Sequence, residues 1–329
     1  MSDRGETVGI VGAGRFGTAL AWLIGKSGRD VMLWSTTASV ASEINSQRTN
    51  RERLPGAELP PSVRATNDPK ELADAARFIV MAVAAVDVRS RARLLGDHLD
   101  GGHILVHAIG SLAKPDDVRV SEVIDQETPV VRIGVVAGPA LAEDLLTGQV
   151  ASMVCASEFD EVTSEARRLL AAPPALRLYQ GRDLVGVELA AALAGAYTVA
   201  LGLADGLGVG AGTRATLITR ATAEGARICA CAGADPATFS GLAGLGNLLV
   251  RASAKSASPA YRFGLALAGG ERPTQALPVG ARAAIPALRL AERQGERAPV
   301  LRAVDAVVSG THSAQEAAAM AAGTVAWEE

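Results

Sequence analysis

Three glycines near the start of the chain have the spacing of a phosphate-binding turn. Gly12, Gly14 and Gly17 follow the apolar run 8–11 and precede the helical pattern 18–24. In such a strand-turn-helix unit the first glycine permits the tight turn and the second lets the backbone approach a pyrophosphate. The third allows close helix-strand packing, and the helix N-terminus offers unpaired N–H groups. The motif predicts a dinucleotide site, with a tight turn that binds no ligand as the alternative.

The end of the next strand bears on the choice of cofactor. Residues 30–35 are expected to form a second strand and complete a βαβ unit. An acidic residue at its end would bind the ribose 2′-hydroxyl of NAD, but Ser35 and Thr36 stand there, with no acid or arginine adjacent. We therefore assign both residues to the cofactor site, together with Arg15 and Phe16 of the turn. The cofactor is NAD or NADP, and the sequence leaves the choice open.

Strand-like and helix-like patterns alternate over the first 180 residues. Buried strands are expected at 78–83, 104–108, 130–136 and 152–156, and helices at 38–47, 70–77, 88–98 and 160–171. This alternation is typical of an α/β domain, a doubly wound parallel sheet of the Rossmann type. We expect residues 1–180 to form this dinucleotide-binding domain.

Beyond residue 183 the pattern becomes helical throughout. Segment 184–204 is nearly all apolar, and its length alone would suit a membrane span, but Glu188 and many small residues fit a buried helix better. Further helices are expected at 214–231, 262–268, 281–294, 299–309 and 314–322. The glycine-rich segment 240–249 is expected to be a tight loop whose backbone closely approaches another group. Residues 181–329 are thus expected to form an all-α domain.

Composition limits the classes of function. The chain has 329 residues, of which 49% are hydrophobic and 20% are charged, and these proportions support large buried cores. A net charge of −3 without basic blocks argues against binding to nucleic acid or to a membrane surface. The three cysteines lack the spacing of a disulfide framework or a metal site, and we expect no signal peptide before the first strand. We expect a cytoplasmic protein without a metal.

Several stretches together resemble the bacterial NAD(P)-dependent glycerol-3-phosphate dehydrogenases. The matching segments, in the family's order, are GAGRFGTALA (12–21), LPG (54–56), AGPALAE (137–143), LITR (217–220), ADPATF (234–239), GLAGLG (241–246) and RFG (262–264). The resemblance implies a Rossmann domain, an all-helical domain and a site between them, where dihydroxyacetone phosphate is reduced to sn-glycerol 3-phosphate for phospholipid synthesis. It also places Ala142 at the cofactor, and Gly138, Arg214 and Arg220 at the substrate. Arg220 could equally form a structural ion pair.

The same resemblance reveals missing charged groups. The ketone oxygen becomes alkoxide-like when it receives hydride, so it needs a cation or a proton donor. The family supplies two lysines, and these align with Gly110 and Ala194 in this chain. Further polar residues of the family align with Asn247, Pro259, Ala260, Gly212, Val279 and Ala284. The resemblance therefore implies a divergent member that lacks the family's catalytic lysines.

Other side chains could act in their place. Tyr197 lies three residues after Ala194 on one helix face and could donate a proton, and His107 ends a strand beside the expected nicotinamide position. We favour packing or capping over catalysis for both residues, and Lys114 and Lys255 fit solvated surface lysines. Two functions remain open: a dehydrogenase of this family, acting on its usual substrate or an altered one, and a catalytically silent dinucleotide-binding or regulatory protein. Either binds a small molecule, and the apolar helices are compatible with a homodimer.

Overall fold

A computed structural model describes residues 7–115, 117–253, 258–271 and 277–322. The chain forms two compact units. The first contains residues 1–109 and 113–184, and the second contains residues 110–112 and 185–329. Lys255 and most of the serine-rich segment around it lie outside the described residues.

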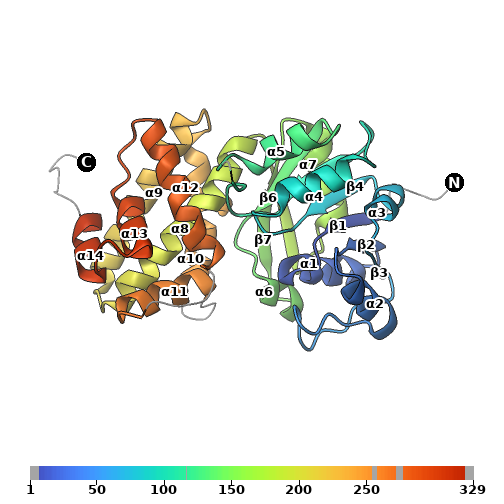
Figure 1. The fold of residues 1–329 in the computed structure, drawn as a ribbon, viewed down its shortest axis with the longest axis horizontal. Helices are drawn as coiled ribbons and strands as arrows, with labels where there is room; N and C mark the ends of the chain where they lie inside the picture. Colours follow the sequence, from blue (N-terminus) through green and yellow to red (C-terminus); the bar gives the residue numbers. More distant parts are fainter. Residues whose placement is uncertain (1–6, 116, 254–257, 272–276, 323–329) are drawn as a thin grey trace. The chain divides into compact units, whose positions relative to one another are not determined.

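The first unit is built on an eight-stranded sheet with the strand order β3-β2-β1-β4-β5-β6-β7-β8 (Figure 1). The strands are β1 (Val8–Val11), β2 (Val31–Trp34), β3 (Val63–Thr66), β4 (Phe78–Met81), β5 (Ile104–His107), β6 (Arg132–Ala137), β7 (Ala151–Ala156) and β8 (Leu176–Gly181). Strands β1 to β6 pair in parallel, and the order reverses between β1 and β4. In sheets of this type, ligands bind beyond the carboxyl ends of the strands at such a reversal.

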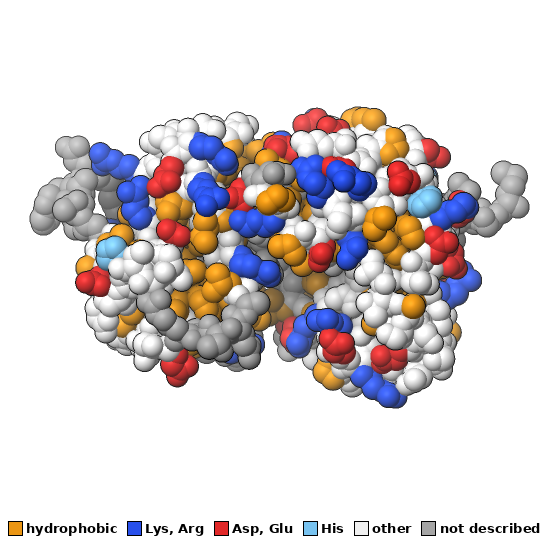
Figure 2. Space-filling view, viewed as in Figure 1, with side chains coloured by type: hydrophobic (Ala, Val, Ile, Leu, Met, Phe, Trp, Pro, Cys, Tyr) orange, Lys and Arg blue, Asp and Glu red, His pale blue; other side chains and the backbone are white. Residues whose placement is uncertain are grey.

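Helices cover both faces of this sheet. They are α1 (Arg15–Lys26), α2 (Ala38–Gln47), α3 (Pro69–Ala75), α4 (Val88–Gly96), α5 (Val120–Glu127), α6 (Ala142–Thr147) and α7 (Asp160–Leu170). Alternate strand residues enter two separate cores, as Ile10 belongs to a core with residues of α1, α2, α6 and α7, while Val11 belongs to a core with residues of α3, α4 and α5. The predicted doubly wound α/β fold is confirmed. On the visible face of this unit, basic and acidic side chains are interspersed (Figure 2).

One pair of strands departs from the expected parallel arrangement. Strand β7 runs antiparallel to β6, and β8 then pairs in parallel with β7. The connection from β6 to β7 contains only the short helix α6, which packs against α1. The sheet is therefore mostly parallel, with its last two strands reversed relative to β1 to β6.

The second unit is helical in its described part. Its helices are α8 (Leu184–Gly206), α9 (Ala211–Cys231), α10 (Asn247–Arg251), α11 (Pro259–Ala268), α12 (Val279–Arg293), α13 (Pro299–Ser309) and α14 (Ala314–Ala322). The prediction of a loop at 240–249 is wrong, because a π-helical turn at Leu242–Gly246 runs directly into α10. The close backbone approach is confirmed, since a Cβ at Gly244 would lie 2.1 Å from the carbonyl oxygen of Phe239.

Helix α8 is the one described helix that is long and apolar enough to cross a membrane, with a mean hydropathy of 1.8. Inside the protein, 94% of its most apolar window is buried. The helix carries Glu188 and Tyr197, and both are buried. These properties fit the core helix of a helical domain, as the small residues of its sequence indicated.

Candidate functional site

Two glycines of the turn between β1 and α1 are required by the backbone geometry of the turn itself. Gly12 has a φ of +108°, and a Cβ there would lie 2.6 Å from the carbonyl oxygen of Ala82. A Cβ at Gly17 would lie 2.1 Å from the carbonyl oxygen of Gly12. No side chain fits at such separations, and residues other than glycine rarely adopt the φ of Gly12. These two positions are therefore explained by folding alone.

Gly14 differs from the other two glycines of the turn in its backbone conformation and in the space around it. Its φ is −74°, and a Cβ added there would meet no atom within 4 Å apart from those of its immediate chain neighbours and its own helix. It is the N-cap of α1, where no side chain caps the helix and the first turn contains no acidic residue. The first N–H groups of the helix and the positive end of its dipole therefore remain for an anion. Nothing in the fold requires glycine here, whereas a pyrophosphate lying against the backbone would.

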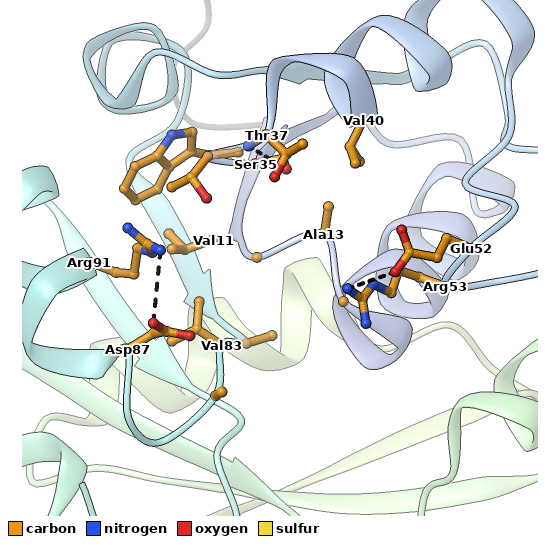
Figure 3. Close-up of a pocket in the computed structure, with 16 residues that line it drawn as sticks. Val11, Ala13, Ser35, Thr37, Val40, Glu52, Arg53, Val83, Asp87 and Arg91 are labelled. Carbon is orange, nitrogen blue, oxygen red and sulfur yellow. Dashed lines mark hydrogen bonds and ion pairs between the residues drawn. The ribbon is translucent and has the colours of Figure 1, made fainter. Parts of the chain in front are cut away.

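A cavity of about 340 Å³ opens at this turn, at the carboxyl ends of β1, β2 and β4 (Figure 3). Its lining includes four of the predicted cofactor residues, namely Gly12, Gly14, Ser35 and Thr36. The Ser35 hydroxyl accepts a hydrogen bond of 3.2 Å from the backbone N–H of Thr37, so it helps to shape the start of α2. The structure thus brings the glycine turn and the end of β2 around one cavity at the reversal of strand order.

The cavity also contains charged side chains that the sequence did not indicate. Arg91 of α4 lies on one wall, 3.9 Å from Asp87, and Arg53 lies on another, 2.9 Å from Glu52 (Figure 3). All four residues come from segments that follow α2 or β4 in the chain. These four residues meet at one cavity because of the order of the strands in the sheet, so they could not be grouped without knowing that order. Each guanidinium group is paired with a carboxylate of the same lining, so these four side chains add no net charge to the cavity wall.

The remaining predicted residues of the first unit do not line this cavity. Arg15 forms an ion pair with Glu143, and Phe16 packs against the core below α1. Ala142 begins α6 and is buried in the same core. Gly138 has a φ of +147°, and a Cβ there would lie 2.8 Å from the backbone of Met153, so a close backbone approach explains this glycine.

The two other candidates of the first unit have structural contacts. His107 ends β5, is 1% exposed, and accepts a hydrogen bond of 3.4 Å at Nδ1 from the N–H of Ile109. Lys114 forms an ion pair with Asp117. The contact of His107 agrees with packing, whereas Lys114 is a partly buried lysine paired with a buried aspartate and not the solvated surface lysine that was expected.

In the second unit, Tyr197 belongs to a closed hydrogen-bonded cluster. Its side chain is 0% exposed, and its hydroxyl donates to Oε1 of Glu224 at 3.0 Å. Glu224 also accepts the backbone N–H groups of Val300 at 2.9 Å and Leu301 at 3.0 Å. Burial and the carboxylate raise the pKa of Tyr197 well above 10.0, and burial raises the pKa of Glu224 above 4.5. The cluster joins α8, α9 and the start of α13.

The two predicted substrate arginines of α9 make separate contacts. Arg214 pairs with Asp205 at 3.0 Å and donates through Nη2 to the carbonyl oxygen of Ala252 at 2.9 Å. Arg220 donates to the carbonyl oxygen of Ala321 at 3.1 Å. Arg220 lies six positions after Arg214, so the two side chains project from different faces of α9. The structure gives both a role in holding helices together and does not bring them to one site.

Comparison with known proteins identifies the family. The model for the N-terminal part of NAD-dependent glycerol-3-phosphate dehydrogenase matches residues 7–163, and the model for its C-terminal part matches residues 183–319. The chain belongs to this family. The fold, the glycine turn and the order of the two parts all agree with this membership.

Relatives and solved structures of the glycerol-3-phosphate dehydrogenase family match nearly the whole chain. The chain is 37% identical over 309 residues to glycerol-3-phosphate dehydrogenase [NAD(P)+] of Streptomyces avermitilis, covering 91% of each chain. It is 33% identical over 320 residues to the Geobacter sulfurreducens protein of the same name, covering 95% of each. The crystal structure of glycerol-3-phosphate dehydrogenase from Coxiella burnetii superimposes with a TM-score of 0.90 at 27% identity, covering 97% of this chain and 99% of that one.

Three positions singled out in the sequence, Ala194, Gly110 and Asn247, lie in the second unit. Ala194 of α8 is 0% exposed, and its carbonyl oxygen accepts a hydrogen bond of 2.7 Å from Thr198. Gly110 offers room, since a Cβ there would have neighbours no closer than 3.6 Å. Asn247, at the start of α10, is 3% exposed. In the described part of the chain, no group of three or more His, Cys, Asp or Glu side chains could hold a metal ion.

Proposed function

We propose that this protein binds NAD or NADP at the turn between β1 and α1, in the cytoplasm. The observation that supports this most strongly is the empty space beside Gly14 at an uncapped helix start. The cavity there is bordered by Ser35, Thr36 and the guanidinium groups of Arg53 and Arg91. Hydroxyls and cations suit the ribose and phosphate groups of the adenosine half of either cofactor.

We further propose that its reaction is the one named for its relatives, the interconversion of dihydroxyacetone phosphate and sn-glycerol 3-phosphate. A bound nicotinamide would supply or accept the hydride. The protein must then hold the substrate phosphate and stabilise the charge that develops on the carbonyl oxygen. With glycine at 110 and alanine at 194, the chain lacks the lysines that the family resemblance places there. We expect turnover to be about 10²- to 10⁴-fold slower than with those groups present.

One observation favours a second candidate, a dinucleotide-binding protein without turnover. Tyr197 is the substitute proton donor closest in sequence to Ala194, yet its hydroxyl is held by buried Glu224 and its pKa is raised. A phenol held in this way is a poor proton donor to a substrate. This candidate shares the cofactor site with the first and differs only in turnover.

The two candidates are separated by measuring dihydroxyacetone phosphate-dependent oxidation of NADH and NADPH. The Streptomyces avermitilis relative serves as the reference under identical conditions. Measurable turnover, about 10²- to 10⁴-fold below the reference, supports the proposed dehydrogenase. No turnover with intact cofactor binding supports the silent protein. Turnover equal to the reference would show that the assigned losses do not matter.

A further inference from the structure

Helix α10 places a cationic side chain next to the open position at Gly110. The Nη2 atom of Arg251 lies 3.6 Å from the point that a Cβ of residue 110 would occupy. The carbonyl oxygen of Ala191, on α8, lies at the same distance from that point. Residues 110–112 belong to the same compact unit as α8 and α10. A side chain from the end of α10 thus reaches the space that a longer side chain at 110 would enter.

The guanidinium group of Arg251 is held in this orientation by Asn247. The Nε atom donates to Oδ1 of Asn247 at 2.7 Å, one helical turn earlier on α10. Asn247 is buried, whereas Arg251 keeps partial contact with solvent. A neutral amide fixes the side chain through Nε and leaves the two terminal nitrogens to make other contacts.

Arg251 lacks a carboxylate partner among the described residues, and its hydrogen bond to Asn247 is its only polar contact there. Arg214, which belongs to the same unit, shows the contrast, because Asp205 neutralises its charge. Burial lowers the pKa of Arg251, as expected for a cation without a counter-charge, although an arginine remains charged at neutral pH. A half-buried, unneutralised guanidinium favours an anionic ligand, and its planar fork matches phosphate oxygens in particular.

We propose that Arg251 binds the phosphate group of a phosphorylated substrate and supplies, from α10, the positive charge that is missing at Gly110. This inference rests on the proposed function for the choice of substrate, sn-glycerol 3-phosphate and its ketone. It makes Arg251 a substrate-binding residue that neither the glycine turn nor the matching segments indicated. Asn247 is then a positioning residue, since it acts through the guanidinium group.

Calorimetric titration of the full chain with sn-glycerol 3-phosphate tests the proposal. Inorganic phosphate and glycerol serve as separate probes of the two halves of the ligand. Arg251→Gln is expected to weaken binding of glycerol 3-phosphate and of phosphate by at least about tenfold, because charge-assisted hydrogen bonds are lost. Arg302→Gln is the matched control, since Arg302 is an exposed arginine of α13 that pairs at 3.4 Å with exposed Glu292. It should change either affinity by less than about twofold.

A second variant tests the geometry even if Arg251→Gln is unstable. In Gly110→Lys/Arg251→Gln, the new side chain starts 3.6 Å from the former Nη2 position, so it should restore most of the lost phosphate affinity. Equal binding by wild type and Arg251→Gln would overturn the proposal, and so would wild-type protein that binds neither phosphate probe. Phosphate binding that depends on Arg251 without any turnover would leave the inference standing and reject the proposed dehydrogenase.

Discussion

The turn between β1 and α1 and the middle of α8 differ in whether their polar groups have hydrogen-bond partners within the protein. At the turn, α1 starts without a side-chain cap, and no other part of the protein fills the space where a Cβ of Gly14 would lie. In α8, the hydroxyl of Tyr197 is matched to Glu224, which in turn accepts two backbone N–H groups at the start of α13. Unsatisfied groups at an accessible helix end indicate a ligand, whereas a complete buried network indicates structure. We therefore assign the turn to binding and Tyr197 to folding.

The largest effect is expected from removing the centre of the α8 network. Glu224→Ala leaves the Tyr197 hydroxyl and the N–H groups of Val300 and Leu301 buried without an acceptor. The free energy of unfolding should fall by about 3–5 kcal/mol in chemical denaturation. Glu292→Ala removes an exposed carboxylate and should cost less than about 1 kcal/mol. Similar losses for both variants would mean that the cluster is not a structural unit.

The next largest loss of stability is expected from replacing a glycine that the turn itself requires. Gly17→Ala places a Cβ 2.1 Å from the carbonyl oxygen of Gly12, so the turn must distort. We expect a loss of about 3 kcal/mol in unfolding free energy. Gly14→Ala, three residues earlier, meets no such obstacle and should cost no more than about 1 kcal/mol, the difference between glycine and alanine at a helix N-cap. If Gly14→Ala destabilised the protein as much as Gly17→Ala, the distinction between a structural and a ligand-facing glycine would be lost.

A smaller loss of stability is expected from removing the hydroxyl of Tyr197. Tyr197→Phe removes one donor to Glu224, whose Oε1 still accepts the N–H of Leu301, so stability should fall by about 1–2 kcal/mol. NAD(P)H affinity and any dihydroxyacetone phosphate-dependent rate should stay within about twofold of wild type. Tyr179→Phe alters an exposed phenol of β8 and is the matched control. Loss of turnover in Tyr197→Phe with unchanged stability would instead identify Tyr197 as the proton donor.

The same network predicts a pH dependence. The pKa of Glu224 is raised above 4.5 in the folded protein by burial, so the folded state holds its proton more tightly than the unfolded state. The contribution of this group to stability is complete below pH 4.5 and declines as the pH rises through the raised pKa. Glu224→Gln cannot titrate. The stability difference between wild type and this variant should therefore shrink with rising pH, and a difference that grows would reverse the assigned shift.

Local patterns predicted the helices with clear start and stop signals. The helices expected at 299–309 and 314–322 are confirmed as α13 and α14, and Pro299 and Gly310 mark the first and last turns of α13. Strands β3 and β8 and helix α5 were not predicted, because each is short and mixes polar with apolar residues. At 240–249 the glycines indicated close packing but could not show that the backbone would stay helical.

The candidate site likewise has one part that the local sequence predicted and one part that it did not. The glycine turn and the end of β2 lie close together in the sequence, so their meeting at one cavity could be expected from the βαβ pattern. Arg53, Arg91 and Arg251 could not be assigned, because each reaches its place through contacts between distant segments. The family resemblance drew attention to Gly110 but gave no indication that Arg251 of α10 reaches the same space.

Titration of NADH and NADPH into wild type and Gly14→Ala tests the central claim most directly. We expect saturable binding of at least one cofactor by wild type. Binding should be weakened by at least about tenfold, or about 1.4 kcal/mol, in a Gly14→Ala variant that is still folded. A flat wild-type titration with both cofactors, or equal affinity in the variant, would contradict the assignment of the turn as a dinucleotide site.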